Sequence, residues 1–353
     1  MAIIGIDLGT TNSLVCAYKD GAARLIPNVF GKTLTPSVVS VAEDGSIYVG
    51  AVAKERLVTH PEATAASFKR YMGTDKVFEL AGSRFRPQEL SSFILRQLKE
   101  DAERFLGEEV TEAVVSVPAY FNDNQRYATK EAGELAGIKV ERLINEPSAA
   151  ALTASRLSGR EEGSFLIFDF GGGTLDVSIV DYFDNVIEII AVSGDNHLGG
   201  IDFDEKIARY FCEKHQIDYE GLASGERASL LQYAEQCKRD LSSLKEVTHT
   251  FELNGEKKMT LDNVLLAKLG QDLFDRMALA ITHALNDSDR TIKDVDEIIL
   301  VGVLPRCRQS VSFCRLLLER RRMLWLHRMR LWLQGPEFMP GSKSGKKRSA
   351  IWC

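Results

Sequence analysis

The chain has 353 residues, enough for two domains, and its hydrophobic content of 44% is ordinary for a globular protein with a sizeable core. The formal net charge of −6 combines two unlike parts, since residues 1–303 carry 32 Lys and Arg against 48 Asp and Glu, whereas residues 304–353 carry 12 against 2. No stretch reaches roughly 18 uncharged apolar residues and no basic, apolar leader opens the chain, which argues against a membrane-spanning helix and predicts a cytoplasmic body.

Two stretches of the chain share one pattern. Residues 2–18 read AIIGIDLGTTNSLVCAY and residues 165–180 read FLIFDFGGGTLDVSIV. Each consists of an apolar run, an aspartate, a glycine turn with threonine, and a second apolar run, which predicts a β-hairpin rather than a strand that enters a helix. Two lobes that arose by an old duplication would explain the repeat.

Between the two hairpins, helical and strand patterns alternate. Apolar residues recur at steps of three and four from Leu90 to Phe105 and stop at Gly107, which predicts an amphipathic helix with a glycine beyond its end. The strand pattern AVVSVP follows, and Asn122 or Asp123 can then cap a helix that runs to about Ala136, before the short strand VERLI. Strands that alternate with helices predict an α/β core.

After the second hairpin, residues 204–245 are rich in helix formers with charge on one face. The segment THTFELNGEKKMTL then predicts a hairpin that turns at Asn254-Gly255. Together these patterns indicate an inserted α+β subdomain.

The two glycine turns have the chemistry of a phosphate site. Consecutive backbone N–H groups exposed in such a turn form a concave anion site, and the hydroxyls of Thr10, Thr11 and Thr174 add further donors. Asp7 and Asp169 precede the turns, where carboxylates can hold a hydrated Mg²⁺ that bridges phosphates. One such turn alone is equally compatible with a structural hairpin, but the paired occurrence favours a clamp around a triphosphate.

At these residues the sequence resembles the seventy-kilodalton heat-shock chaperone family, in its N-terminal ATPase domain. The resemblance covers residues 2–302. It is carried by six segments of this chain: GIDLGTTNS, VVSVPAYFNDNQRYATKEAGELAG, LINEPSAAAL, FDFGGGTLDVS, GDNHLGGIDFD and AEQCKRDLSS. The chain departs from the commonest form at Asn12, where a Tyr is usual, and the region before Arg84 is short, which suggests a specialised bacterial member.

The resemblance implies an α/β fold of the actin-like, two-lobed ATPase type with inserted subdomains and a truncated second lobe. The first lobe would span residues 1–160, with its core in 1–36 and 88–160 and an insert at about 37–87. The second lobe would span 161–302, with its core in 161–203 and about 281–302 and an insert at about 204–280. Residues 303–353 would form a separate basic tail.

The resemblance also implies the site residues. Catalytic roles fall on Lys69, Glu146, Asp169 and Thr174, and the metal would lie at Asp7 and Asp169. By the resemblance, Lys69 would be the lysine of hydrolysis, and an ammonium there can hold the attacking water and neutralise charge on the γ-phosphate. The nucleotide would contact Gly9, Thr10, Thr11, Asn12, Gly171, Gly172, Gly173, Gly199, Gly200, Glu235, Lys238 and Ser242.

The implied function is ATP hydrolysis that drives cycles of binding to unfolded peptide. Cofactors would be ATP or ADP with Mg²⁺, and K⁺ is a further candidate. Partners would be a J-domain co-chaperone and a nucleotide-exchange factor, with unfolded peptide bound only through a peptide-binding domain that this sequence lacks; we expect neither nucleic acid nor a membrane. A small-molecule kinase and a nucleotide-dependent filament protein on the same fold are the alternatives.

The chain changes character near Val303. Relatives continue the strand EIILVG with a polar loop whose arginine packs on adenine and then a helix, and that pattern is missing here. If each codon's third base is read with the next two bases, residues 302–313 permit GATPMPAVRQF and residues 327–341 permit PDEVVVAGAGIHAG, which restores the expected segments. We therefore interpret the tail as out of frame; the alternative is a genuine basic amphipathic appendage for anionic lipid or nucleic acid.

Overall fold

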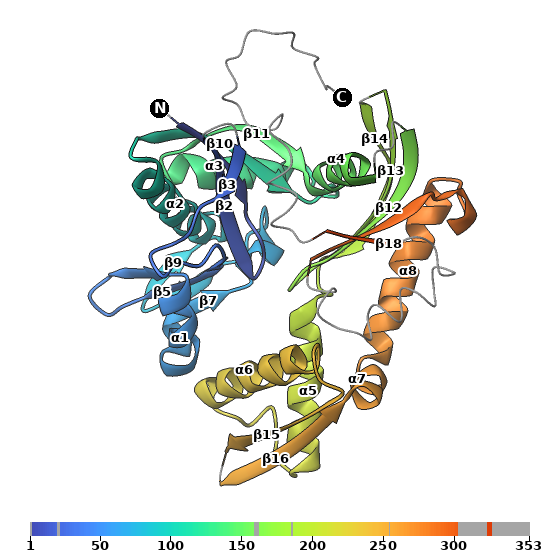
Figure 1. The fold of residues 1–353 in the computed structure, drawn as a ribbon. Coiled ribbons are helices and arrows are strands. Elements are labelled where there is room, and N and C mark those ends of the chain that lie inside the picture. Colours follow the sequence, from blue (N-terminus) through green and yellow to red (C-terminus); the bar gives the residue numbers. More distant parts are fainter. Residues whose placement is uncertain are drawn as a thin grey trace.

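The computed structural model describes residues 2–19, 22–158, 162–184, 186–253, 255–302 and 323–326. Figure 1 shows two lobes, one built from the N-terminal half of the chain and coloured blue to teal, the other coloured green to red. Each lobe is centred on a mixed sheet, and an inserted unit lies below each sheet in this view. The predicted α/β fold is confirmed.

The sheet of the first lobe has the strand order β11-β10-β1-β2-β3, with β4 paired to β2. β1 and β2 are antiparallel across the first glycine turn, as predicted, whereas β10 lies parallel to both β1 and β11. Parallel neighbours need a crossover, and α3 supplies it between β10 and β11. The strands are β1 (Ala2–Asp7), β2 (Asn12–Lys19), β3 (Ala22–Leu25), β4 (Thr35–Pro36), β10 (Val110–Val117) and β11 (Lys139–Asn145).

Two helices of this lobe begin and end where local sequence signals place them. α2 (Pro87–Leu106) ends at Gly107, whose φ of 74° is a left-handed conformation that suits glycine. α3 (Asp123–Leu135) begins after Asn122, whose side chain accepts a hydrogen bond from the backbone of Gln125. The predicted ends of both helices and the predicted start of α3 are therefore confirmed to within one or two residues, whereas α2 begins three residues before Leu90.

Short elements between β4 and α2 form the inserted unit of the first lobe. β5 pairs with β6 and β7, and β8 pairs with β9. The 3-10 helix η2 carries the segment SFKRY toward the second lobe. The elements are β5 (Val38–Val41), β6 (Ile47–Val49), α1 (Ala51–Thr59), η1 (Pro61–Ala63), β7 (Thr64–Ala66), η2 (Phe68–Tyr71), β8 (Phe78–Leu80) and β9 (Ser83–Phe85).

The sheet of the second lobe has the order β14-β13-β12-β17-β18. It repeats the first: β12 and β13 form an antiparallel hairpin around the second glycine turn, and β17 lies parallel to β12. β18 adds a parallel strand beside β17, and the rest of the 303–353 tail lies outside the described residues. The strands are β12 (Glu162–Phe170), β13 (Leu175–Phe183), β14 (Val186–Asp195), β17 (Glu297–Gly302) and β18 (Met323–Leu326).

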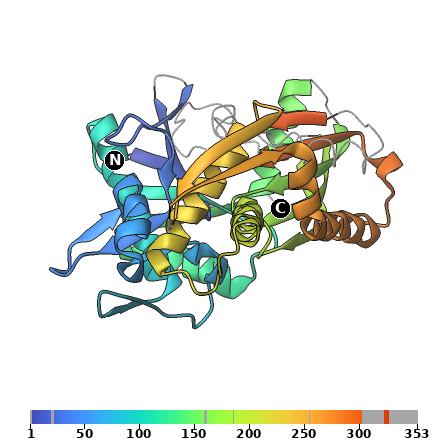
Figure 2. The same cartoon turned by 90° about the horizontal axis from the view of Figure 1, so that it is seen from below.

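Helices and one hairpin between β14 and β17 make up the rest of the second lobe. Seen from below in Figure 2, α5, α6 and the β15–β16 hairpin lie in front of the sheets, and α8 packs along β13 and β14. The predicted hairpin is present, although residue 254 of its turn lies outside the described residues. The elements are α5 (Gly200–Lys214), α6 (Ser224–Asp240), β15 (Glu246–Glu252), β16 (Glu256–Asp262), α7 (Asn263–Leu269), α8 (Gln271–Asp287) and η3 (Ile292–Asp294).

A shared core joins the two lobes around α4 (Glu146–Ser158). Leu14 of β2, Ala151 of α4 and Phe165 of β12 belong to one buried cluster, whereas each lobe also has a core of its own. Among the described residues, no helix is both long and apolar enough to cross a membrane.

Candidate functional site

The first glycine turn is fixed by hydroxyl groups of its own lobe. The backbone N–H of Gly9 donates to Ser13 Oγ at 3.2 Å, and Ser37 Oγ donates to the Gly9 carbonyl at 2.7 Å. The two serine hydroxyls also bond each other at 2.9 Å. Gly9, Ser13 and Ser37 all belong to the first lobe. These hydrogen bonds therefore hold the turn that presents Thr10 and Thr11 without a donor from the second lobe.

Backbone amides of the next glycine segment fix the second turn. Gly171 N–H donates to the Thr174 carbonyl at 2.8 Å, which closes the turn. The amides of Gly200 and Ile201 then donate to the carbonyls of Gly171 and Gly172, at 3.1 and 2.8 Å. The two glycine segments of this lobe are therefore interlocked through their main chains.

The two turns face each other in contact. A Cβ atom at Gly172 would overlap the Thr11 side chain, and one at Gly173 would lie 2.5 Å from Thr10 Cγ2. Gly199 approaches so closely that a Cβ there would overlap the backbone of Gly172 and Gly173. Glycine fits these positions because a methyl group would overlap threonine side chains at Gly172 and Gly173 and the main chain at Gly199.

Lys69 and Glu146 meet at this junction, although 77 positions separate them in the chain. Lys69 Nζ lies 3.4 Å from Glu146 Oε1, and both side chains are buried, with Lys69 only 8% exposed. The ammonium also lies over the Phe121 ring at 5.5 Å. A buried charge needs a partner, and the carboxylate at the start of α4 supplies it.

The aspartates of the two hairpins lie buried at the ends of their strands. Ser116 Oγ donates to Asp7 Oδ1 at 3.2 Å, and Asp169 lies opposite Asp176 in the β12–β13 register. Burial raises the pKa of Tyr120, and the nearby charges of Asp176, Glu146 and Asp169 raise it further. The same hydroxyl hydrogen-bonds the side chain of Thr174. The sequence patterns did not single out Tyr120.

Residues predicted to contact adenosine lie on or just after α6 and face the second glycine segment. Lys238 Nζ donates to the Gly200 carbonyl and pairs with Asp204 Oδ1 at 2.6 Å. Burial raises the pKa of Asp204 to about 6 despite this partner. Glu235 Oε2 lies 2.9 Å from Lys54 Nζ of α1, which ties the two inserted units together.

The remaining predicted residues take less central places. Ser242 Oγ contacts the Lys238 carbonyl at 3.5 Å, one turn further along the chain. Asn12 is the exposed first residue of β2 and pairs with Pro36. Neither lies at the point where the two turns touch.

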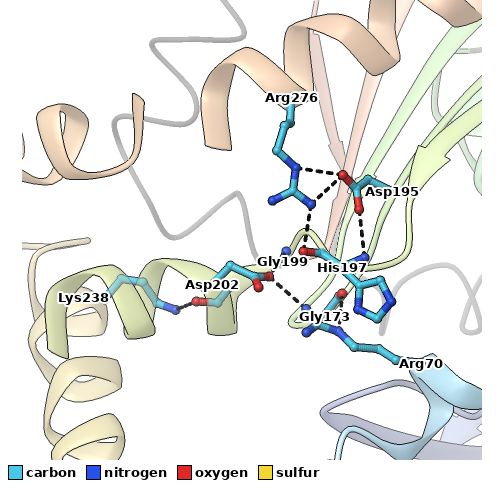
Figure 3. A network of polar contacts seen from close by, with 9 residues as sticks. Arg70, Gly173, Asp195, His197, Gly199, Asp202, Lys238 and Arg276 are labelled. Atoms are coloured by element: carbon cyan, nitrogen blue, oxygen red, sulfur yellow. Dashed lines mark hydrogen bonds and ion pairs between the residues drawn. The ribbon is translucent and has the colours of Figure 1, made fainter. Parts of the chain in front are cut away.

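Arg70 is a second residue that the sequence patterns missed, although it follows Lys69 directly. Its Nε donates to the Gly173 carbonyl at 2.7 Å, and its Nη2 pairs with Asp202 Oδ2 at 2.8 Å (Figure 3). Asp202 in turn accepts from the Gly199 amide at 2.6 Å. The figure also shows Arg276 of α8 bound to Asp195 and to the His197 carbonyl, which anchors the loop before Gly199.

Comparison with known proteins shows which family this chain is similar to. A family model described as Hsp70 protein matches residues 3–79 and 75–313, and so extends past Gly302, where the sequence patterns stop. The chaperone protein DnaK of Thermotoga neapolitana is 43% identical over 326 residues, which cover 89% of this chain and 54% of the relative. DnaK of Thermosipho africanus is 44% identical over 327 residues with the same coverage. The chain spans about half the length of the curated relatives that it matches.

Proposed function

This chain belongs to the Hsp70 family, and we propose that its two lobes bind and hydrolyse ATP for a chaperone cycle of unfolded-peptide binding. The junction of the two glycine turns carries the proposal. Within the described residues, the amides of Gly172, Gly173 and Thr174 have no protein acceptor, although they lie where the lobes meet. Successive N–H groups without acceptors are suited to bind phosphate oxygens.

The space at the junction decides how ATP would enter. A pocket of about 10 Å³ lies there, lined by Thr10, Lys69, Arg70 and Thr174 among others. That volume holds about one water molecule, so a triphosphate requires the two turns to move apart. The lobes share a core at α4, and we propose that they pivot there when nucleotide binds.

The residues present fit a magnesium ion. Asp7 and Asp169 offer buried carboxylate oxygens at the ends of two strands, and Mg²⁺ prefers oxygen ligands while it keeps several waters. When bound, the ion would neutralise charge on the phosphates. Asp176 lies opposite Asp169 and adds a third carboxylate, which would also suit K⁺.

Each side chain around the junction has its own proposed role in hydrolysis. The Lys69 ammonium holds the attacking water and offsets negative charge on the γ-phosphate, and Glu146 orients Lys69 and that water. Thr174 and the turn amides donate to phosphate oxygens. Attack in line with the departing ADP leaves inorganic phosphate beside Lys69.

A single-turnover experiment tests this function. ATP hydrolysis by the frame-corrected chain is compared with that of its Lys69→Ala variant, and Lys130→Ala on the exposed face of α3 serves as a matched control. Lys69→Ala should slow hydrolysis at least about tenfold while it still binds ATP, because the lysine acts mainly on transition-state charge. An unchanged rate would refute its role.

Further assays separate the proposed function from other activities of the fold. Unfolded peptide and a J-domain protein should stimulate hydrolysis by the frame-corrected full-length protein, and a nucleotide-exchange factor should speed ADP release. Sugars and other hydroxyl substrates should not be phosphorylated. ATP should cause no rise in light scattering, which a filament would produce.

A further inference from the structure

Arg70 crosses from the first lobe to the second. It lies on η2 directly after Lys69, and only 11% of its side chain is exposed. Its two hydrogen-bonded partners, Gly173 and Asp202, both belong to the second lobe. Lys69 thus pairs with Glu146 of the first lobe, whereas Arg70 binds a main-chain carbonyl of the second lobe.

The carbonyl that Arg70 binds is the third of a series. The carbonyls of Gly171, Gly172 and Gly173 are held by Gly200 N–H, Ile201 N–H and Arg70 Nε. In a planar trans peptide the C=O of one residue and the N–H of the next point in opposite directions. Each of these bonds therefore sets the direction of the amide that follows, and Arg70 sets that of Thr174.

The source of the three donors differs. The first two are backbone amides of the second lobe itself, so the orientation of the Gly172 and Gly173 amides is built into that lobe. Among the described residues, the carbonyl of Gly173 accepts only from Arg70, which belongs to the other lobe. Only the Gly173–Thr174 peptide therefore depends on how the two lobes meet.

We propose that Arg70 is a positioning residue that turns the Thr174 amide toward the γ-phosphate only when the lobes close. Because Arg70 and Lys69 are neighbours on η2, one movement brings the ammonium to the water and orients the opposing amide. Hydrolysis then requires both lobes in register. This inference rests on the proposed function and assigns a further part of its machinery.

The competing explanation for the contacts of Arg70 is a structural role: an ion pair or hydrogen bond that only holds the two lobes together, called a tie below. Lys54 and Glu235 form such a tie at 2.9 Å between α1 and α6, at the other inserted unit. Loss of a tie should weaken nucleotide binding and chemistry together. Loss of a positioning residue should lower the rate of the chemical step more than the affinity, because the oriented amide stabilises charge that develops in the transition state.

The kinetic test compares Arg70→Ala with Arg84→Ala, an exposed arginine of the same inserted unit. Arg70→Ala should lower the single-turnover rate at least about tenfold while ADP affinity changes less than about threefold. Added methylguanidinium should restore part of that rate, whereas Arg84→Ala should behave as the parent chain. Equal losses of rate and affinity, or no rescue, would overturn the proposal.

A second measurement does not need catalysis. Amide hydrogen exchange of Gly171, whose N–H bonds the Thr174 carbonyl, should rise in Arg70→Ala and stay unchanged in Arg84→Ala. Asp202→Asn, which removes the second partner of Arg70, should raise it partway. If the frame-corrected chain fails to hydrolyse ATP, the proposed function is wrong, yet exchange still decides the role of Arg70. Unchanged exchange at Gly171 contradicts that role.

Discussion

The sheets of the two lobes share a topology in which β1 corresponds to β12, yet within the described residues only the second glycine turn takes a hydrogen bond from the other lobe. In the first lobe the order is β11-β10-β1-β2-β3, and in the second it is β14-β13-β12-β17-β18. Ser13 and Ser37 hold the first turn from within its own lobe. The second turn is held by the segment at Gly200 and by Arg70 of the other lobe.

The difference indicates that only the geometry of the second turn depends on the relative position of the lobes. A turn fixed by buried hydroxyls of its own lobe keeps its shape whether the lobes are open or closed. A turn that needs a donor from the opposite lobe reaches its final geometry only on closure. In an enzyme whose lobes move, the second arrangement links chemistry to conformation.

The largest effect is expected in the second lobe, from a change in the sequence that follows Gly302. A version in which the reading frame is restored should bind ATP at least about tenfold more tightly and melt at a higher temperature than the chain as written. A helix over the sheet covers on the order of 300 Å² of apolar surface, worth roughly 7 kcal/mol, and the family's loop adds a stacking surface for adenine. Isothermal titration and thermal melting of both chains measure this, and equal values would refute the frame-error interpretation.

A smaller loss of stability and of ATP binding is expected for Gly199→Ala in the second lobe. The new methyl group would overlap backbone atoms of Gly172 and Gly173, which cannot retreat without loss of the bonds to the next segment. We expect a loss of about 2–3 kcal/mol in the free energy of unfolding and at least about tenfold weaker ATP binding. Urea denaturation and nucleotide titration report these effects. Gly163→Ala is the matched control, because its nearest neighbours lie at an ordinary 3.5 Å.

The pH dependence of stability probes the buried pair behind the second turn. Asp204 faces Lys238, Glu235 and Lys54, and burial raises its pKa from 3.8 to about 6. The folded state therefore binds the proton more tightly than the unfolded chain, so stability from this group is greatest below pH 4 and is lost as pH rises through 6. Relative to Asp204→Asn, the free energy of unfolding should fall by about 2 kcal/mol between pH 4 and pH 7. A constant difference across that range in urea denaturation would contradict the shift.

The smallest effect is expected in the first lobe, where the turn has redundant support. Ser37→Ala removes the donor to the Gly9 carbonyl and one side of the serine pair, while Ser13 still binds the Gly9 amide. Stability should fall by about 1–2 kcal/mol, the cost of one buried carbonyl without a partner. Ser243→Ala, at an exposed hydroxyl, is the control and should change chemical denaturation little. A larger loss of ATP binding than in Gly199→Ala would reverse the comparison between the lobes.

Much of this protein was determined by the sequence alone. The repeated hairpins, the glycine turns and the family segments predicted the fold, and Gly107 and Asn122 marked helix ends that the structure confirms. These features are local, because a left-handed φ or a side-chain cap depends on residues within four positions. The roles of Lys69, Glu146, Thr174 and the other site residues remain predictions that the geometry supports.

Tertiary structure alone decided which charges meet. Arg70 and Gly173 lie 103 positions apart, and Lys54 and Glu235 lie 181 apart. A cation on a short 3-10 helix has the same sequence signature whether it faces solvent or another lobe, and the raised pKa of Asp204 depends on burial that three separate elements create. Local patterns specify backbone conformation, but packing between distant segments sets the distances and the desolvation on which electrostatic pairing depends.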